Sequence, residues 1–181
     1  MLMDTSDTAL AMAARAGDRD AFGVLVARHY DRLHALAWRL TGSASEADDL
    51  TQDICASLPA KLGGFRGEAR FTTWLYRVAV NAAHDARRRA ATRARAAAGW
   101  GDWELARQDA MAEDRAAQDW LATAMRSLPE DLRDTLALVM GEAMTQGRAA
   151  EVLGLSEGTV AWRMSEVKRR LRALAAQEAT P

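Results

Sequence analysis

Apolar residues recur at helical spacing along most of this 181-residue chain. Over residues 9–90 the three-to-four-residue period is interrupted at residues 41–42 and around 63–64, and it returns over residues 115–176. Runs of β-branched residues and Asn-Gly turns, which would indicate strands and hairpins, are missing. The sequence therefore predicts an all-α protein of packed helices joined by short turns.

A change in composition divides the chain in two. Residues 91–114 are rich in alanine, arginine and acids without a sustained apolar stripe, which is typical of a linker or a marginal helix. We expect two small helical domains, residues 1–90 and 115–181, joined by this linker. Exposed indoles are unfavourable, so Trp100 and Trp103 within it are expected to dock on a neighbouring domain or on a partner.

Charge and composition narrow the functional classes. The formal net charge of −1 excludes a uniformly basic DNA-coating protein, so any nucleic-acid site must arise from local segregation of charge. The single cysteine, Cys55, cannot form an internal disulfide, and we expect an inert, partly buried thiol rather than a redox switch. No signal peptide or bilayer-spanning apolar run is evident, so we expect a cytoplasmic protein that does not insert into membranes.

Residues 149–160 (AAEVLGLSEGTV) predict a helix-turn-helix. Ala150 permits close approach of two helices, Gly154 a tight turn, and Ser156 can cap the second helix. A generic helical hairpin is the alternative. The second helix has an apolar stripe of Val160, Met164, Val167, Leu171 and Leu174. Its other faces could meet duplex DNA or simply be solvated; the candidate DNA contacts are Thr159, Trp162, Arg163, Ser165, Glu166, Lys168 and Arg169.

The segment 72–89 predicts a helix with two distinct faces. One is apolar and comprises Leu75, Val78, Ala82 and Ala86. The other combines an aromatic ring, an amide and positive charge, a set suited to an unstacked single strand, and comprises Trp74, Arg77, Asn81, His84 and Arg88. Trp74 packed inward as part of the core is the alternative, and Arg77 and Asn81 would then be ordinary surface residues.

A third helix is predicted over residues 44–58, opened by a capping box of Ser43 and Glu46. Its apolar side comprises Ala47, Leu50, Ile54 and Leu58. Its acidic side would repel DNA, and it suits either a basic protein surface or solvent; it comprises Asp48, Asp49, Gln52 and Asp53.

The order of these motifs resembles one family. His29-Tyr30, residues 46–53 (EADDLTQD), residues 65–75 (FRGEARFTTWL) and Asn81 are similar to the promoter-melting domain of extracytoplasmic-function sigma factors of the sigma-70 family. Leu128-Pro129, Arg133 and residues 158–160 resemble the C-terminal domain of that family. The resemblance covers nearly the whole chain except its ends and linker.

The resemblance implies a transcription initiation factor that directs core RNA polymerase to promoters, in a stress or envelope-type response, under an anti-sigma factor. It implies that Asp48, Asp49, Gln52 and Asp53 contact the polymerase clamp helices, and that the second domain reads the −35 element as duplex DNA. It also implies a site for the −10 single strand. Residues 65–70, with Trp74 and Asn81 nearby, are implied to capture a flipped base of the −10 element. When the polar face of the helix over residues 72–89 is added, the predicted −10 site comprises Phe65, Arg66, Gly67, Glu68, Arg70, Trp74, Arg77, Asn81, His84 and Arg88.

In this family the linker enters polymerase channels that otherwise hold nucleic acid. From charge and resemblance, the linker's acidic residues are expected to imitate phosphates there; they are Asp102, Glu104, Asp109, Glu113 and Asp114.

The chain departs from the family pattern in its helix-turn-helix. Arg148 precedes Ala149-Ala150 where an acidic residue is usual, Ala161-Trp162-Arg163 follow Val160 where Lys-Ser-Arg is common, and Glu166 replaces a usual arginine. The −35 sequences of the family therefore do not carry over. Trp162 could contact a thymine methyl, an anti-sigma protein, or the first domain in a closed form.

Two other functional classes remain as alternatives. A stand-alone regulator would bind duplex DNA through the helix-turn-helix, but no ligand-pocket or phosphoacceptor pattern accompanies it. An enzyme is disfavoured because no nucleophile, base or metal constellation is evident. His29, His34 and His84 lack metal-ligand spacing, so we expect no metal, cofactor or small-molecule substrate.

Overall fold

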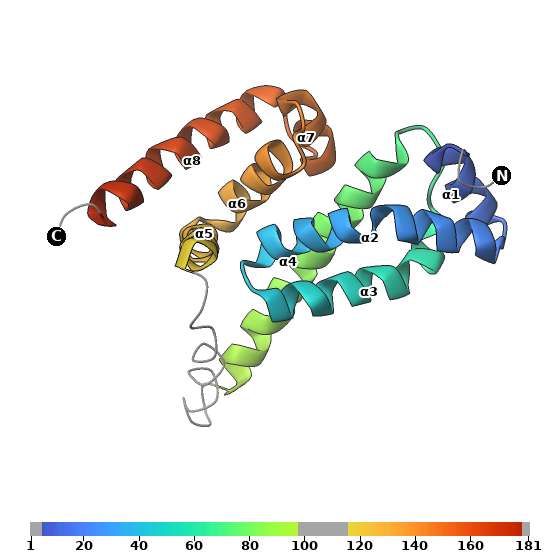
Figure 1. Cartoon of the computed structure of the whole chain (residues 1–181), viewed down its shortest axis with the longest axis horizontal. Helices are drawn as coiled ribbons and strands as arrows, with labels where there is room; N and C mark the ends of the chain where they lie inside the picture. The colour runs from blue at the N-terminus through green and yellow to red at the C-terminus, as the bar shows by residue number, and fades with distance from the viewer. Residues whose placement is uncertain (1–4, 98–115, 179–181) are drawn as a thin grey trace.

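The computed structural model describes residues 5–97 and 116–178, and these residues contain helices and turns but no strand (Figure 1). The all-α prediction is confirmed. The N-terminal domain comprises α1 (Asp7–Arg15), α2 (Arg19–Thr41), α3 (Ala44–Leu62) and α4 (Phe71–Ala97). The C-terminal domain comprises α5 (Ala116–Ser127), α6 (Glu130–Leu136), the π-helical turn η4 (Ala137–Gly141), α7 (Gln146–Leu153) and α8 (Glu157–Glu178).

Local capping explains where α2 ends and α3 begins. Gly42 follows α2 in the left-handed conformation, with φ 74°, which glycine adopts without steric cost. Ser43 then caps α3, and its hydroxyl accepts a hydrogen bond from the Glu46 amide at 3.4 Å. The predicted start of this helix is confirmed, and the helix continues past residue 58, through Pro59, to Leu62.

The N-terminal core lies mainly between α2, α3 and α4. The predicted apolar side of α3 is confirmed, since Ala47, Leu50, Ile54 and Leu58 are all buried. Burying one such leucine or isoleucine contributes about 1.5–3 kcal/mol, so this stripe holds α3 with its acidic side facing outward.

The helix-turn-helix is formed by α7, a short turn and α8. Gly154 ends α7 with φ 67°, and the Ser156 hydroxyl accepts a hydrogen bond from the Thr159 amide at 3.1 Å. Val160, Met164 and Val167 are buried, as their spacing predicted. Leu171 and Leu174 are half-buried nearer the end of the helix.

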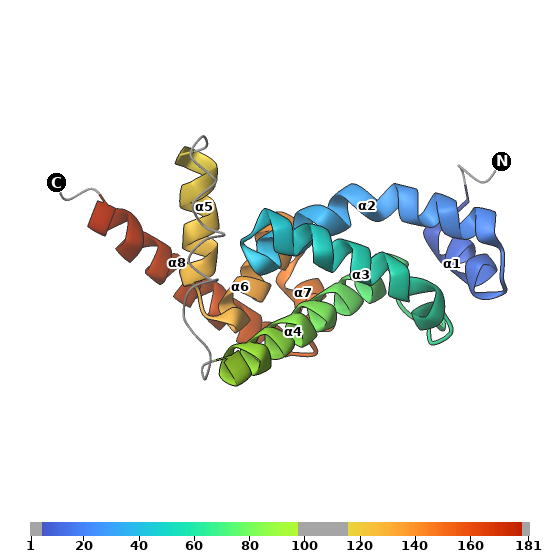
Figure 2. The ribbon, with the colours of Figure 1, turned by 90° about the horizontal axis from the view of Figure 1, so that it is seen from below.

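The two domains pack against each other. α7 contacts α4, while α5, α6 and η4 contact α2, and Figure 2 shows α7 beside α4. Residues of η4, α7 and α8 belong to the same hydrophobic cluster as the N-terminal core. The buried side of α4 is consequently broader than predicted: Leu75 is buried as expected, Val78, Ala82 and Ala86 are half-buried, and Tyr76, Ala79, Val80 and Ala83 are buried as well.

α4 extends to Ala97 and so includes the first residues of the segment expected as a linker. Residues 98–115 lie outside the described residues, and with them Trp100, Trp103 and the linker acids. None of the described helices combines the length and apolarity needed to cross a membrane. Within the same described ranges, no group of three or more His, Cys, Asp or Glu side chains could hold a metal ion.

Candidate nucleic-acid interface

The acidic side of α3 faces solvent. Asp48, Asp49, Gln52 and Asp53 are all exposed, while the opposite side of the helix is buried. Asp48 pairs with His34 of α2 at 2.8 Å, and Asp53 lies 3.7 Å from Arg89 of α4. Exposed pairs of this kind contribute little to stability, so the carboxylates remain available to a basic protein surface.

The loop between α3 and α4 is anchored by aromatic packing. Phe65, at 2 % exposure, has its ring centroid 5.8 Å from that of Phe71 and 5.4 Å from that of Trp74. The Arg15 guanidinium also donates a hydrogen bond to the Phe65 carbonyl at 3.0 Å. The ring of Phe65, predicted to contact DNA, therefore lies in the core in this conformation and holds the loop in place.

The remaining predicted loop residues point outward. Arg66, Gly67, Glu68 and Arg70 are exposed, and Gly67 has φ 74°, so the backbone turns where a side chain would be strained. Trp74 is half-buried and stacks at a tilt 5.7 Å from Phe71. Part of the indole of Trp74 thus packs on the core, and part of it reaches the surface.

The polar face of α4 meets the C-terminal domain. Arg77 donates a hydrogen bond to the backbone carbonyl of Glu151 in α7, and His84 Nε2 lies 2.6 Å from Asp134 Oδ2 in α6. Asn81 and Arg88 are exposed. Arg88 also donates to Asp85, and this hydrogen bond holds the pKa of Asp85 below its usual value.

Two buried carboxylates at this interface were missed by the sequence reasoning. Asp134 is 2 % exposed and also accepts hydrogen bonds from Arg87. The side chain of Glu142 is 6 % exposed; it pairs with Arg39 at 3.0 Å and accepts a hydrogen bond from the Tyr76 hydroxyl at 2.7 Å. Burial is the main cause that raises the pKa of Tyr76, and the neighbouring Glu142 raises it further. No spacing in the sequence distinguishes these acids from solvated ones.

The outer side of α8 combines free and paired side chains. Trp162 is 64 % exposed, and Ser165, Lys168 and Arg169 are exposed too, whereas Thr159 is half-buried. Arg163 lies 3.5 Å from Asp131 of α6. Because Trp162 is largely exposed while the domains are packed together, it is not buried against the first domain in this closed arrangement.

The negative charge of Glu166 is balanced by two arginines of its own helix. It accepts hydrogen bonds from Arg169 at 2.5 Å and from Arg170 at 2.7 Å, and these lower the pKa of Glu166 to about 2. Its carboxylate therefore stays ionised and paired at neutral pH. The unexpected acid on α8 orients two arginines rather than presenting a free negative charge to DNA.

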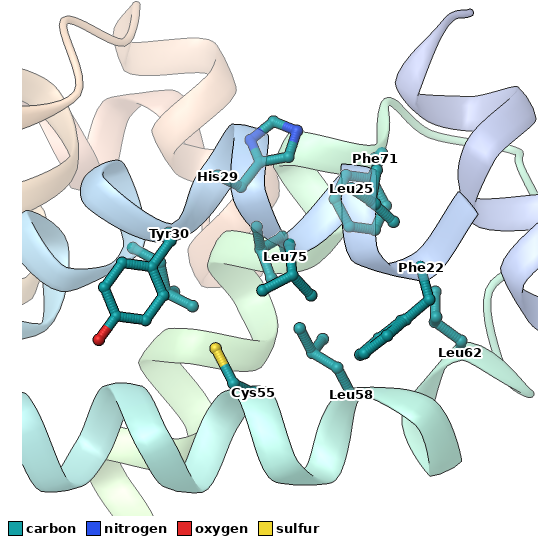
Figure 3. Close-up of a pocket in the computed structure, with 11 residues that line it drawn as sticks. Phe22, Leu25, His29, Tyr30, Cys55, Leu58, Leu62, Phe71 and Leu75 are labelled. Atoms are coloured by element: carbon teal, nitrogen blue, oxygen red, sulfur yellow. The ribbon is translucent and has the colours of Figure 1, made fainter. Parts of the chain in front are cut away.

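A narrow apolar pocket is lined by residues of α2, α3 and α4 (Figure 3). The Cys55 sulfur points from α3 toward α2, near Tyr30, and burial raises the pKa of this thiol. Cys55 is half-buried, which confirms its expected placement. A raised pKa lowers the thiolate fraction and so disfavours reactivity.

Comparisons with known proteins follow this division into two domains. Residues 25–93 match the family model for sigma-70 region 2, and residues 118–171 match that for sigma-70 region 4. The chain is 38 % identical over 173 residues to the ECF RNA polymerase sigma factor SigM of Mycobacterium tuberculosis, covering 94 % of this chain and 85 % of the relative. It is 30 % identical to the RNA polymerase sigma-H factor of Pseudomonas aeruginosa, covering 94 % of both.

Solved structures are similar to this chain over both domains. One of them is that of CnrH in complex with the cytosolic domain of CnrY, with a TM-score of 0.73 and 28 % identity, covering 97 % of this chain and 100 % of that one.

Proposed function

Because this chain belongs to the extracytoplasmic-function group of the sigma-70 family, we propose that it is an RNA polymerase sigma factor that binds core polymerase and directs promoter-specific initiation of transcription. The observation that carries this proposal is the succession of region 2 and region 4 over both helical domains. A helix-turn-helix alone would also suit a stand-alone regulator, but region 2 would then have no role.

The two domains divide the work in this proposal. The exposed acidic side of α3 contacts the polymerase, through Asp48, Asp49, Gln52 and Asp53. The exposed loop residues Arg66, Glu68 and Arg70, with Trp74 and the polar face of α4, hold the −10 single strand by stacking and charge. The outer side of α8 reads the −35 duplex, with Trp162, Lys168 and Arg169 as its most accessible groups.

The protein supplies recognition rather than chemistry, and it acts in the cytoplasm, where the polymerase performs catalysis. CnrH, which is similar over both domains, is bound by the cytosolic domain of another protein. We therefore propose that an anti-sigma factor restrains this chain also, and that release occurs in a stress or envelope-type response.

Run-off transcription with core polymerase from the native host and genomic fragments tests the function. Adding the protein is expected to produce new discrete transcripts whose upstream sequences share −35 and −10 elements. Failure to bind core polymerase, together with tight duplex binding by the purified protein alone, would instead establish the stand-alone regulator.

A further inference from the structure

The C-terminal domain rests on the face of α4 that is proposed to hold the −10 strand. Arg77 and His84, both on that face, bond to α7 and α6 respectively. The arrangement in Figure 2 therefore covers part of the site that promoter DNA needs. Two buried carboxylates, Asp134 and Glu142, bond the C-terminal domain to the N-terminal domain, and they are here called the interdomain carboxylates.

Asp134 bonds to the cationic side of α4. Arg87 Nη2 lies 3.1 Å from each of its carboxylate oxygens, and His84 Nε2 lies 2.6 Å from one of them. Glu130 adds a second acid, 3.6 Å from Arg87 Nε. Guanidinium and imidazole donors that hold a carboxylate are the donors that would hold a phosphate, so Asp134 occupies groups that DNA could otherwise use.

Glu142 fastens the opposite end of the interface. It bonds to Arg39 of α2 and Tyr76 of α4 from the end of η4. The neighbouring Gly141 leaves room for this contact, because a Cβ on it would lie 2.4 Å from Arg39 Cδ and the arginine side chain would have to shift. Arg126 and Arg133 also donate to the carbonyls of Gly42 and Leu40, each at 3.4 Å, at the C-terminal end of α2.

We propose that the interdomain carboxylates hold the free protein in an autoinhibited, closed arrangement, and that the domains must separate before α4 can engage the promoter. Asp134 acts as an internal substitute for a DNA phosphate at Arg87 and His84. This inference rests on the proposed function, since it describes the regulation of the same site.

Interdomain distances measured by electron spin resonance test the proposal directly. Spin labels on Lys61→Cys and Arg172→Cys, in a Cys55→Ser background, report from exposed sites on the two domains of the full chain. The unaltered interface should give one narrow distance distribution, and separation of the domains should broaden it or add a second one. Asp134→Asn and Glu142→Gln should each raise the open-to-closed ratio about tenfold, since each weakens charge-assisted hydrogen bonds.

Glu157→Gln is the matched control. It makes the same change of carboxylate to amide on an exposed side chain of the same domain, and it should leave the distances unchanged. Gly141→Ala should open the protein without any change of charge, because the added methyl displaces Arg39 from Glu142. Circular dichroism establishes that each variant remains helical. Unchanged distance distributions in Asp134→Asn, Glu142→Gln and Gly141→Ala would overturn the proposal.

Access to α4 provides a second readout. Anisotropy of a fluorescein-labelled 12-nucleotide dT strand at low salt should show about tenfold tighter binding by Gly141→Ala, whose charge is that of the parent. Opening without tighter binding would show that the closed domains do not block α4 and would overturn autoinhibition. Neither experiment uses polymerase, so a protein that fails in run-off transcription but opens as predicted disproves the function and leaves the closed arrangement established.

Discussion

On α8, the exposed side chains differ from those that pack the domain together. Trp162 is 64 % exposed on a helix whose opposite side is buried, so its indole does not stabilise the domain by burial. Glu166, which departs from the family pattern, is explained by its hydrogen bonds to Arg169 and Arg170. These residues alter what the helix displays without altering how it packs.

Replacing Trp162 by alanine should therefore affect function more than folding. We expect the free energy of unfolding to change by less than about 0.5 kcal/mol, as for other exposed sites, and promoter-dependent run-off transcription to fall about tenfold. Thermal denaturation and run-off assays measure the two effects. Undiminished transcription would assign Trp162 to a protein partner rather than to the −35 element.

For Ser156, in contrast, we expect an effect on stability. Its hydroxyl accepts the hydrogen bond that starts α8, so Ser156→Ala should cost about 1 kcal/mol of stability in the C-terminal domain. Urea denaturation measures this cost, and Ser156→Asp, which keeps an acceptor at the same position, is the control expected to retain the stability. Equal losses in both variants would show that capping is not the cause.

At the scale of an element, α3 shows how one helix carries two independent functions. Its apolar residues are buried and its acids are exposed, so substitutions on the two sides should have separable effects. The buried apolar stripe sets the rotation of the helix, and with it the outward direction of the acidic side.

Reversing one charge on the acidic side should weaken the polymerase contact. Asp49→Arg is expected to reduce core-polymerase affinity at least about tenfold, which corresponds to about 1.4 kcal/mol, with the melting temperature unchanged. Asp31→Arg, the same reversal at an exposed position of α2, is the control. Equal affinities for the two variants in a fluorescence binding assay would remove α3 from the proposed contact.

On the scale of the whole molecule, the two domains behave as one unit because they share a hydrophobic cluster and several buried polar contacts. The bonds to Asp134, Glu142 and the end of α2 all link residues far apart in the sequence. These hydrogen bonds therefore stabilise the closed arrangement of the two domains rather than either domain alone.

Calorimetry should consequently show one cooperative unfolding transition for the native sequence. Gly141→Ala is expected to give two transitions, because the added methyl interferes with Arg39 and uncouples the domains. Gly23→Ala is the control: a Cβ there meets nothing within 4 Å, and alanine in a helix should keep one transition at an equal or higher temperature. Two transitions in the native sequence would contradict the coupling.

Much of the fold was predictable because it depends on local periodicity and capping. The α3 stripe, the start of α3 at Ser43, the turn at Gly154 and the cap at Ser156 were all anticipated and are confirmed. Each depends on residues within a few positions of one another, which is the range over which helical spacing and hydrogen-bonding side chains act.

The sequence by itself thus determined the helices, the helix-turn-helix and the family. Only the tertiary structure decided that Phe65 is core, that α4 is covered on a second side, and that Asp134 and Glu142 are interdomain partners. The physical reason is range: the hydrogen bonds of His84 to Asp134 and of Tyr76 to Glu142 span 50 and 66 residues. Whether an acid is solvated or buried depends on a distant surface that no local pattern encodes.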